Sequence, residues 1–127
     1  MHLHAYDLAD LAAIAYFAGF GLALLAKPSL VNRFGLEWTD RAGQVEVRCY
    51  YGAVSIGTAA FLAYLLSRHA GLDALTCVFI LATAVFSTRL VATAIDGAWS
   101  HAYTRMALPV ECGFVIFLGV ARFAFSR

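Results

Sequence analysis

Charged side chains are scarce in this chain of 127 residues. Asp, Glu, Lys and Arg make up 13% of the sequence and hydrophobic residues 62%, whereas about a quarter of the residues in a soluble domain are charged. A soluble domain of this length could not bury so much apolar surface. The composition therefore predicts an integral membrane protein with room for a single helical domain, residues 1–127.

The residues that several common functions require are also few or wrongly spaced. Nine Lys and Arg against eight Asp and Glu leave a net charge of +1, without the basic patch of a nucleic-acid binder. Cys49, Cys77 and Cys112 lack C-x-x-C spacing, which favours buried free thiols over a disulfide framework; whether Cys49 and Cys112 ever pair stays open. No P-loop, dinucleotide fingerprint, nucleophile elbow or zinc-protease motif is present.

Histidine is absent from every long apolar run, which excludes a haem held by two histidines within the spans. We expect no cofactor. His2 and His4, with His69 and Asp73, could offer imidazole and carboxylate ligands to a transition metal. Two histidines near a chain end are more often without a function, so we assign no metal site.

Four apolar runs predict membrane-spanning helices, at about 7–26, 43–66, 73–95 and 108–125. Roughly 20 residues, at 1.5 Å each, cross about 30 Å of hydrocarbon. The first run lacks a basic leading region and a small-residue cleavage site, so we interpret it as a retained helix and not a signal peptide. Short links between consecutive runs favour an all-α, up-and-down four-helix transmembrane bundle.

The connecting segments carry signals of their own. Apolar residues at near-helical spacing in 29–41 predict a short amphipathic helix in the membrane interface, anchored by Trp38. Asp73 is a candidate cap for the third helix, and Pro109 suits the first turn of the fourth. In the first helix, small residues recur every fourth position and predict a close helix contact, including one between copies of the chain: Ala15, Gly19 and Ala23.

The distribution of basic residues gives the orientation. The side of the first and third links has four Lys and Arg, and the opposite side has three. The first helix often dominates, and its leading flank has no Lys or Arg, whereas three follow it. We therefore expect the N-terminus outside and the first link in the cytoplasm of a bacterial inner membrane, in which the chain is multi-pass.

Ionisable residues inside the apolar runs are the strongest indication of a functional site. Glu46 and Arg48 open the second span, and the remaining members of the set lie at the end of the third and the start of the fourth: Arg89, Asp96 and Glu111. Because the spans alternate in direction, all five fall at one membrane depth. Intramembrane charges are costly and are usually buried, paired or functional.

We interpret these charges as one polar pocket within a single leaflet. Three carboxylates against two guanidiniums leave one carboxylate without a partner, and desolvation would favour its neutral form; Glu46, Asp96 and Glu111 are the candidate acid–base residues. Arg48 and Arg89 could instead hold an anionic ligand. The hydroxyls expected to assist are on the same helix faces: Tyr51, Ser55 and Thr93. The structural alternative is that the pairs fix helix register or extend to the headgroups.

The same residues give the chain a family resemblance. Glu46, Arg48 and Tyr51-Gly52 open the second helix, Asp96-Gly97 closes the third after Arg89, and Glu111 lies in the fourth. In this order the chain resembles a family of small bacterial four-helix membrane proteins known as a domain of unknown function, and more remotely the DoxX-like group. The resemblance implies a four-helix bundle, but no substrate. Ala53 stands where the pattern would have a second glycine.

Three functions fit these observations. The first is binding of a small lipophilic or lipid-like ligand, with acid–base chemistry of the isomerase type if one carboxylate is neutral; whether the protein is an enzyme stays open. The second is an accessory or structural subunit that packs through the row of small residues. The third is proton-coupled transport, for which four short helices without broken-helix pairs leave little space. Membrane lipids are expected partners in each case.

Overall fold

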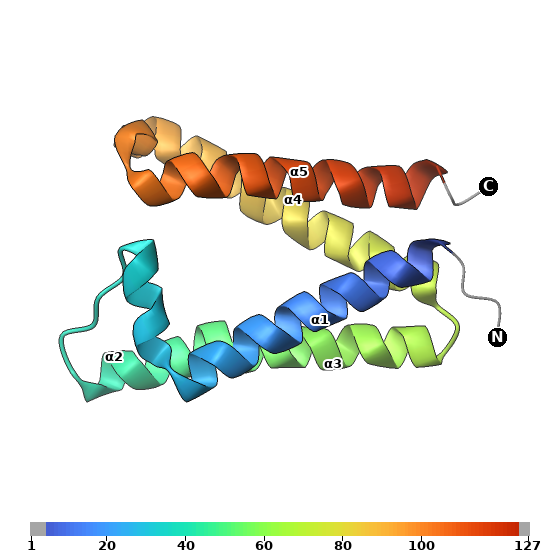
Figure 1. The fold of residues 1–127 in the computed structure, drawn as a ribbon, viewed down its shortest axis with the longest axis horizontal. Helices are drawn as coiled ribbons and strands as arrows, with labels where there is room; N and C mark the ends of the chain where they lie inside the picture. Colours follow the sequence, from blue (N-terminus) through green and yellow to red (C-terminus); the bar gives the residue numbers. More distant parts are fainter. Residues whose placement is uncertain (1–4, 125–127) are drawn as a thin grey trace. The chain divides into compact units, whose positions relative to one another are not determined.

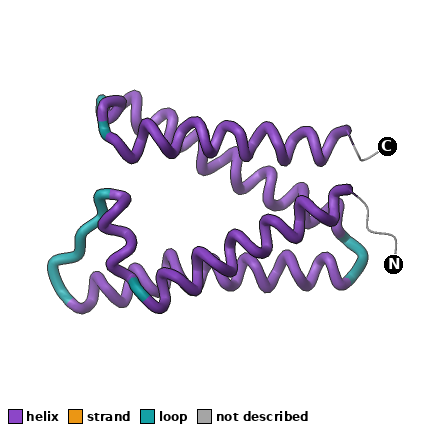
Figure 2. Tube along the Cα trace, viewed as in Figure 1, coloured by secondary structure: helices purple, strands orange, loops and turns teal. Residues whose placement is uncertain are grey.

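The computed structural model describes residues 5–124, and helices form nearly all of that stretch (Figures 1 and 2). In chain order the elements are α1 (Ala5–Ala26), η1 (Pro28–Phe34), α2 (Arg41–Glu46), η2 (Val47–Ala53), α3 (Val54–Ser67), α4 (Gly71–Asp96), η3 (Ala98–Ser100) and α5 (Ala102–Ala124). Residues 5–124 contain no β-strand. The prediction of an all-α fold is confirmed.

Within residues 5–124, four helical segments are long and apolar enough to cross a membrane: Asp7–Ala26, Arg41–Ser67, Gly71–Asp96 and Ala102–Ala124. The second comprises α2, η2 and α3 in unbroken succession. Each has at least the roughly 20 residues that a helix needs to span the hydrocarbon core. The chain therefore has the character of a multi-pass membrane protein, as its composition predicts.

The first link contains the expected short helix, but Trp38 lies outside it. The helix η1 is a 3₁₀ helix that Gly35 ends in a left-handed conformation, with φ of 76°. Trp38 follows in the non-helical segment, with its Cβ so close to Gly43 that a side chain at residue 43 would meet it at 2.7 Å. Asp40 caps α2 by accepting a hydrogen bond from Gly43 N at 2.8 Å, so the second span begins two residues earlier than predicted.

Two predictions about helix starts are wrong. The N-cap of α4 is Ala70, without a side-chain hydrogen bond, and Asp73 lies inside the first turn. Pro109 lies inside α5, which begins at Ala102. The aromatic and polar residues before Leu108 resemble a loop in composition, yet they form the first turns of α5. An interior proline loses one backbone hydrogen bond, a loss that transmembrane helices tolerate.

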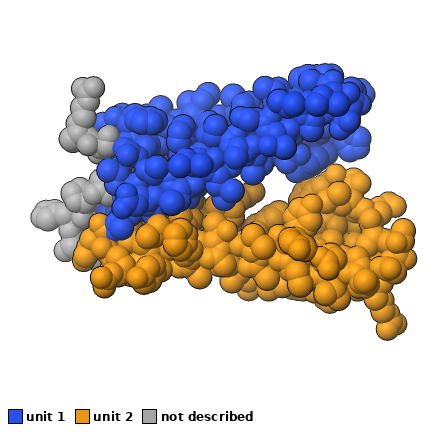
Figure 3. Space-filling view, turned by 180° about the vertical axis from the view of Figure 1, so that it is seen from behind, with its two compact units in different colours: residues 1–9, 70–127 blue, residues 10–69 orange. Residues whose placement is uncertain are grey.

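Internal contacts divide the chain into two compact units (Figure 3). Unit 1 comprises residues 1–9 and 70–127, and unit 2 comprises residues 10–69. The expectation of a single domain over the whole chain stays a prediction.

In unit 2, α1 packs against η2 and α3 through two glycines. A Cβ on Gly21 would lie 2.8 Å from the carbonyl oxygen of Gly52, and a Cβ on Gly52 would lie 2.8 Å from Leu25 Cδ2. Only residues without a side chain allow this approach. The predicted row behaves differently: Ala15, Gly19 and Ala23 are all exposed, and a Cβ on Gly19 would have nothing within 4 Å. The close contact within this unit thus lies on another face of α1.

In unit 1, α4 and α5 form an antiparallel pair (Figure 1). Leu75, Val78 and Leu118 are buried at the end of the pair where α4 begins. Phe79 and Phe123 meet edge to face there, with ring centroids 5.8 Å apart, and Gly119 leaves room for the Phe79 ring, which a Cβ at residue 119 would approach to 3.3 Å. A hydrogen bond of 2.6 Å from Arg122 Nε to Thr76 Oγ1 joins the two helices beside these rings.

We expect Thr76→Val to lower the free energy of unfolding by about 1.5 kcal/mol, because a hydrogen bond to a charged group contributes about 1.5–3 kcal/mol and Arg122 can partly recover by extending towards water. Thr83→Val is the matched control. Both hydroxyls donate to the carbonyl four residues earlier, but only Thr76 also accepts from an arginine. Equal unfolding midpoints for the two variants in a detergent titration would contradict this role for Arg122.

Candidate functional site

The predicted site residues fall into two groups, one in each unit. Unit 1 holds Arg89, Thr93, Asp96 and Glu111, and unit 2 holds Glu46, Arg48, Tyr51 and Ser55. The structure brings the members of the first group together around α4. That the two groups share one pocket stays a prediction.

An ion pair across α4 and α5 is the centre of the unit 1 group. Arg89 Nε lies 2.8 Å from both carboxylate oxygens of Glu111, and the two side chains are 28% and 23% exposed. The Tyr103 ring, in the first turn of α5, lies under the guanidinium, with its centroid 5.2 Å from Arg89 Cζ. Arg89 is therefore fixed on two sides, by a carboxylate and by an aromatic face.

The depth of this ion pair follows from helix geometry. Arg89 lies seven residues before the end of α4, which at 1.5 Å per residue is about 10 Å of helix. Glu111 comes from the third turn of α5. In a membrane spanned by α4, a guanidinium at this position would lie inside one leaflet but near its surface, where an arginine is least costly when it is paired.

A cavity of about 480 Å³ lies along the same face of α4. Its polar lining comes from Thr88, Arg89, Thr93 and Asp96, and its apolar lining from Ala84, Val85, Ala92 and Ala98. The α4 residues in this set recur three or four positions apart, which places them on one side of the helix. Thr93 is 5% exposed, whereas Asp96 is exposed at the helix end. The volume is within the range of small-molecule sites, about 300–1,000 Å³.

Helix α4 ends at this cavity because Gly97 adopts a left-handed conformation, with φ of 66°. Its N–H donates to the carbonyl of Thr93, the usual way in which glycine closes a helix. The chain then turns through η3 into α5, which carries Tyr103 and Glu111 back towards Arg89 (Figure 1). The Asp96-Gly97 pair thus both ends the helix and lines the site.

In unit 2, Arg48 binds the main chain. Its Nε donates to the carbonyl of Leu25 at 3.2 Å. This carbonyl is in the last turn of α1, where helix carbonyls lack partners and the helix dipole favours a cation. Arg48 therefore links the end of α1 to η2 through this hydrogen bond. The sequence contains no signal of this structural role.

The surroundings of Arg48 are a π-helix, η2, in which Val54 N–H donates to the carbonyl of Cys49, five residues earlier. The wider turn shifts later residues relative to α-helical spacing, so the face expected to join Arg48 with Tyr51 and Ser55 does not continue unchanged. Tyr51 is exposed, and Ser55 Oγ donates to the carbonyl of Tyr51 at 2.6 Å. π-Turns are frequent at functional sites, but they also occur for packing.

The three carboxylates proposed for acid–base chemistry have different environments. Both oxygens of Glu111 accept hydrogen bonds from Arg89 Nε. Glu46 ends α2 in an exposed position and Asp96 ends α4; within residues 5–124, neither forms an ion pair with a basic residue. Within unit 1, Asp96 lines the cavity, and Glu111 contacts Arg89, which also lines it.

No protein-family model, curated protein or solved structure matches this chain. The site is therefore interpreted from its own geometry.

Other reactive side chains add no second site within the described part of the chain. Cys49, Cys77 and Cys112 are free thiols. Residues 5–124 contain no group of three or more His, Cys, Asp and Glu side chains that could hold a metal ion. Of the residues considered above as possible metal ligands, His2 and His4 lie outside the described residues.

Asp10 is an acidic residue within the first apolar run. It lies in the second turn of α1 and is fully buried. The hydropathy pattern contains no signal of this burial, because acidic residues near the N-terminal end of a helix are commonly exposed and favoured by the helix dipole.

Proposed function

We propose that this protein binds a small lipophilic ligand, a lipid or lipid-like molecule, in the cavity along α4. The observation that supports it most is the composition of that cavity: alanine and valine on one part of the wall, and Thr88, Arg89, Thr93 and Asp96 on the other. An amphiphile needs this combination, since its chain contacts apolar side chains while its polar end takes hydrogen bonds.

Binding accounts for the ion pair better than catalysis does. Glu111 holds Arg89 through both carboxylate oxygens, so both oxygens are engaged in positioning the guanidinium. The Tyr103 ring fixes the guanidinium from another side. A rigid, paired cation presents the polar part of the wall in one orientation, which lowers the entropic cost of holding a ligand.

We place the protein in a bacterial cytoplasmic membrane, with the N-terminus outside and the links that carry η1 and η3 on the cytoplasmic side. The absence of Lys and Arg before the first span, and their presence at Lys27, Arg33 and Arg41 after it, support this orientation. The cavity would then open in the inner leaflet.

A cavity-filling variant tests the proposal. In a thermal-stability screen of the purified protein with alkylamines, fatty acids, quinones and sterols, we expect at least one class to raise the unfolding temperature of the wild type. Ala92→Phe fills the cavity and should abolish that increase. Ala94→Phe is the control, because Ala94 is also exposed on α4 but does not line the cavity. Stabilisation of Ala92→Phe equal to that of the wild type would refute the proposal.

A second function has one observation in its favour. Ala15, Gly19 and Ala23 are exposed, and Gly19 has open space beside it. Such a row suits close packing against another transmembrane helix, as in an accessory subunit or a homo-oligomer. Crosslinking in the membrane that recovers only monomers would count against this function.

A further inference from the structure

We propose that the ligand is a lipophilic cation, an amphiphile with a protonated amine as its polar end, and that Asp96 binds the ammonium group. The inference rests on the proposed function, because it assigns a charge to the ligand of the same cavity. It differs from the alternative drawn from the sequence, in which Arg48 and Arg89 hold an anionic ligand.

The charge of Arg89 is already balanced. Its Nε lies 2.8 Å from both oxygens of Glu111, and its guanidinium lies over the Tyr103 ring. An anionic ligand would have to share this arginine with Glu111 and would bring a further negative charge close to two carboxylates, Glu111 and Asp96. Juxtaposed like charges in a partly desolvated site are unfavourable, so the cavity discriminates against anions.

The charge of Asp96 is not balanced within unit 1. Its side chain lines the cavity, and among residues 5–124 it forms no ion pair. It is the last residue of α4, where the helix dipole adds a partial negative charge that also favours a cation. The carboxylate and the C-terminal end of the helix therefore both favour a positively charged group.

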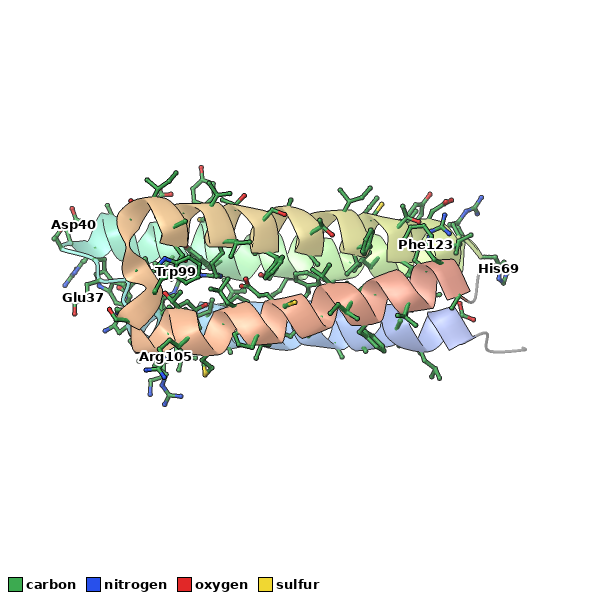
Figure 4. All side chains as sticks on the ribbon, turned by 90° about the horizontal axis from the view of Figure 1, so that it is seen from above. Glu37, Asp40, His69, Trp99, Arg105 and Phe123 are labelled. Carbon is green, nitrogen blue, oxygen red and sulfur yellow. The ribbon has the colours of Figure 1, made fainter. Side chains whose placement is uncertain are left out.

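Two other basic groups near this end of unit 1 do not alter the balance. Arg105, on α5, extends away from α4 in Figure 4, and it is absent from the cavity lining. His101 is exposed in the turn before α5 and does not line the cavity either. The polar wall thus carries one neutralised guanidinium and one unpaired carboxylate, which is complementary to a single positive charge.

The cavity also provides apolar contacts for the alkyl chain of the cationic amphiphile. Ala84, Val85 and Ala92 lie on the α4 face on the side of Asp96 that leads into the membrane. An alkyl chain that follows this face from an ammonium at Asp96 would run along the helix from the headgroup region inwards, past Thr93 and Thr88. A hydroxyl group on the alkyl chain would be able to form a hydrogen bond with one of these threonines.

Three probes with the same chain and different charges test the inference: dodecylamine, dodecanol and dodecyl phosphate. Their binding to the full-length protein is measured in phosphatidylcholine nanodiscs, with binding to empty nanodiscs subtracted. We expect the wild type to bind dodecylamine at least tenfold more tightly than the other two. Asp96→Asn should lose that preference, and Asp96→Lys should favour dodecyl phosphate. Asp73→Asn, the same change at the other end of α4, should keep the wild-type preference.

The outcomes separate this inference from the proposed function. If the three probes bind equally and Ala92→Phe abolishes their binding, the ligand is not selected for positive charge. That result would overturn the cation inference but would still support a lipophilic ligand in the cavity. A preference for dodecyl phosphate in the wild type, or a preference for dodecylamine that survives in Asp96→Asn, would also overturn it. Failure of all three probes to bind, together with a screen that finds no stabilising compound, would overturn both.

Discussion

Replacing Glu111 with glutamine should lower the free energy of unfolding by about 3 kcal/mol, the lower end of the cost of breaking a buried ion pair. The variant leaves the Arg89 guanidinium inside one leaflet without its carboxylate, and the bilayer makes such a charge costly. The lower end of that range applies because the Arg89 and Glu111 side chains are still 28% and 23% exposed. Arg89→Gln should cost a similar amount, since it leaves Glu111 unpaired.

The double variant, Arg89→Gln with Glu111→Gln, shows whether the two effects have one origin. Neutral amides in both positions leave no uncompensated charge, so the double variant should be more stable than either single variant. Glu37→Gln is the control for the chemical change, because Glu37 is exposed in the first link (Figure 4); its effect should stay within about 0.5 kcal/mol. Single effects that simply add in the double variant would show that the two residues do not act as a pair.

Gly21→Ala should destabilise unit 2 by about 1–3 kcal/mol, the usual cost of overpacking a well-packed contact. The added Cβ would lie 2.7 Å from Ile56 Cγ1, 2.8 Å from Gly52 O and 3.0 Å from Ile56 N. Two of these atoms belong to the main chain of the facing helix, so the whole segment must move to relieve the contact. Leu24 and Leu62, both buried in this unit, would lose packing as it moved.

Gly19→Ala is the matched control, two residues earlier in α1. A Cβ there has nothing within 4 Å, and alanine is favoured over glycine in a helix by roughly 0.5–1 kcal/mol. The control should therefore be as stable as the wild type or more stable, whereas Gly21→Ala is less stable. Unfolding is followed by circular dichroism during titration of mixed micelles with a denaturing detergent. Equal midpoints for the two alanine variants would contradict the close contact of α1 with η2.

The helices were largely predictable because hydropathy and length determine them. In a bilayer every backbone group must be satisfied within its own segment, so an apolar run of about 20 residues has little choice but to be helical. The start of α5 was not predictable in this way. Residues 102–107 include Tyr103, Thr104 and Arg105, which an interfacial loop also contains, and Pro109 resembled a first-turn residue.

The packing within each unit could not be predicted, because it depends on which residues of distant segments meet. The spacing of Ala15, Gly19 and Ala23 marks one smooth face of α1, but the glycine that approaches its neighbour is Gly21, opposite Gly52. Nothing local to residue 21 indicates its partner 31 residues later. The hydrogen bond of Arg122 to Thr76 spans 46 residues and was missed for the same reason.

The sequence marks the charged residues around the candidate site as unusual, but it does not indicate which groups they contact. Intramembrane charge alone marks Arg48, Arg89, Asp96 and Glu111 as unusual. Only the structure shows that Arg89 pairs with Glu111 and that Arg48 donates a hydrogen bond to the carbonyl of Leu25. The π-helix that surrounds Arg48 has no sequence signal, so the faces predicted from α-helical spacing were displaced there.

Native mass spectrometry of the protein with the best amphiphile from the stability screen tests the central claim most directly, because it counts ligands on individual molecules. The cavity along α4 predicts one amphiphile retained by the wild type and by Ala94→Phe, and none retained by Ala92→Phe. Retention by all three proteins alike would show that the amphiphile associates with the apolar surface in general, and that the cavity beside Arg89, Thr93 and Asp96 does not bind it.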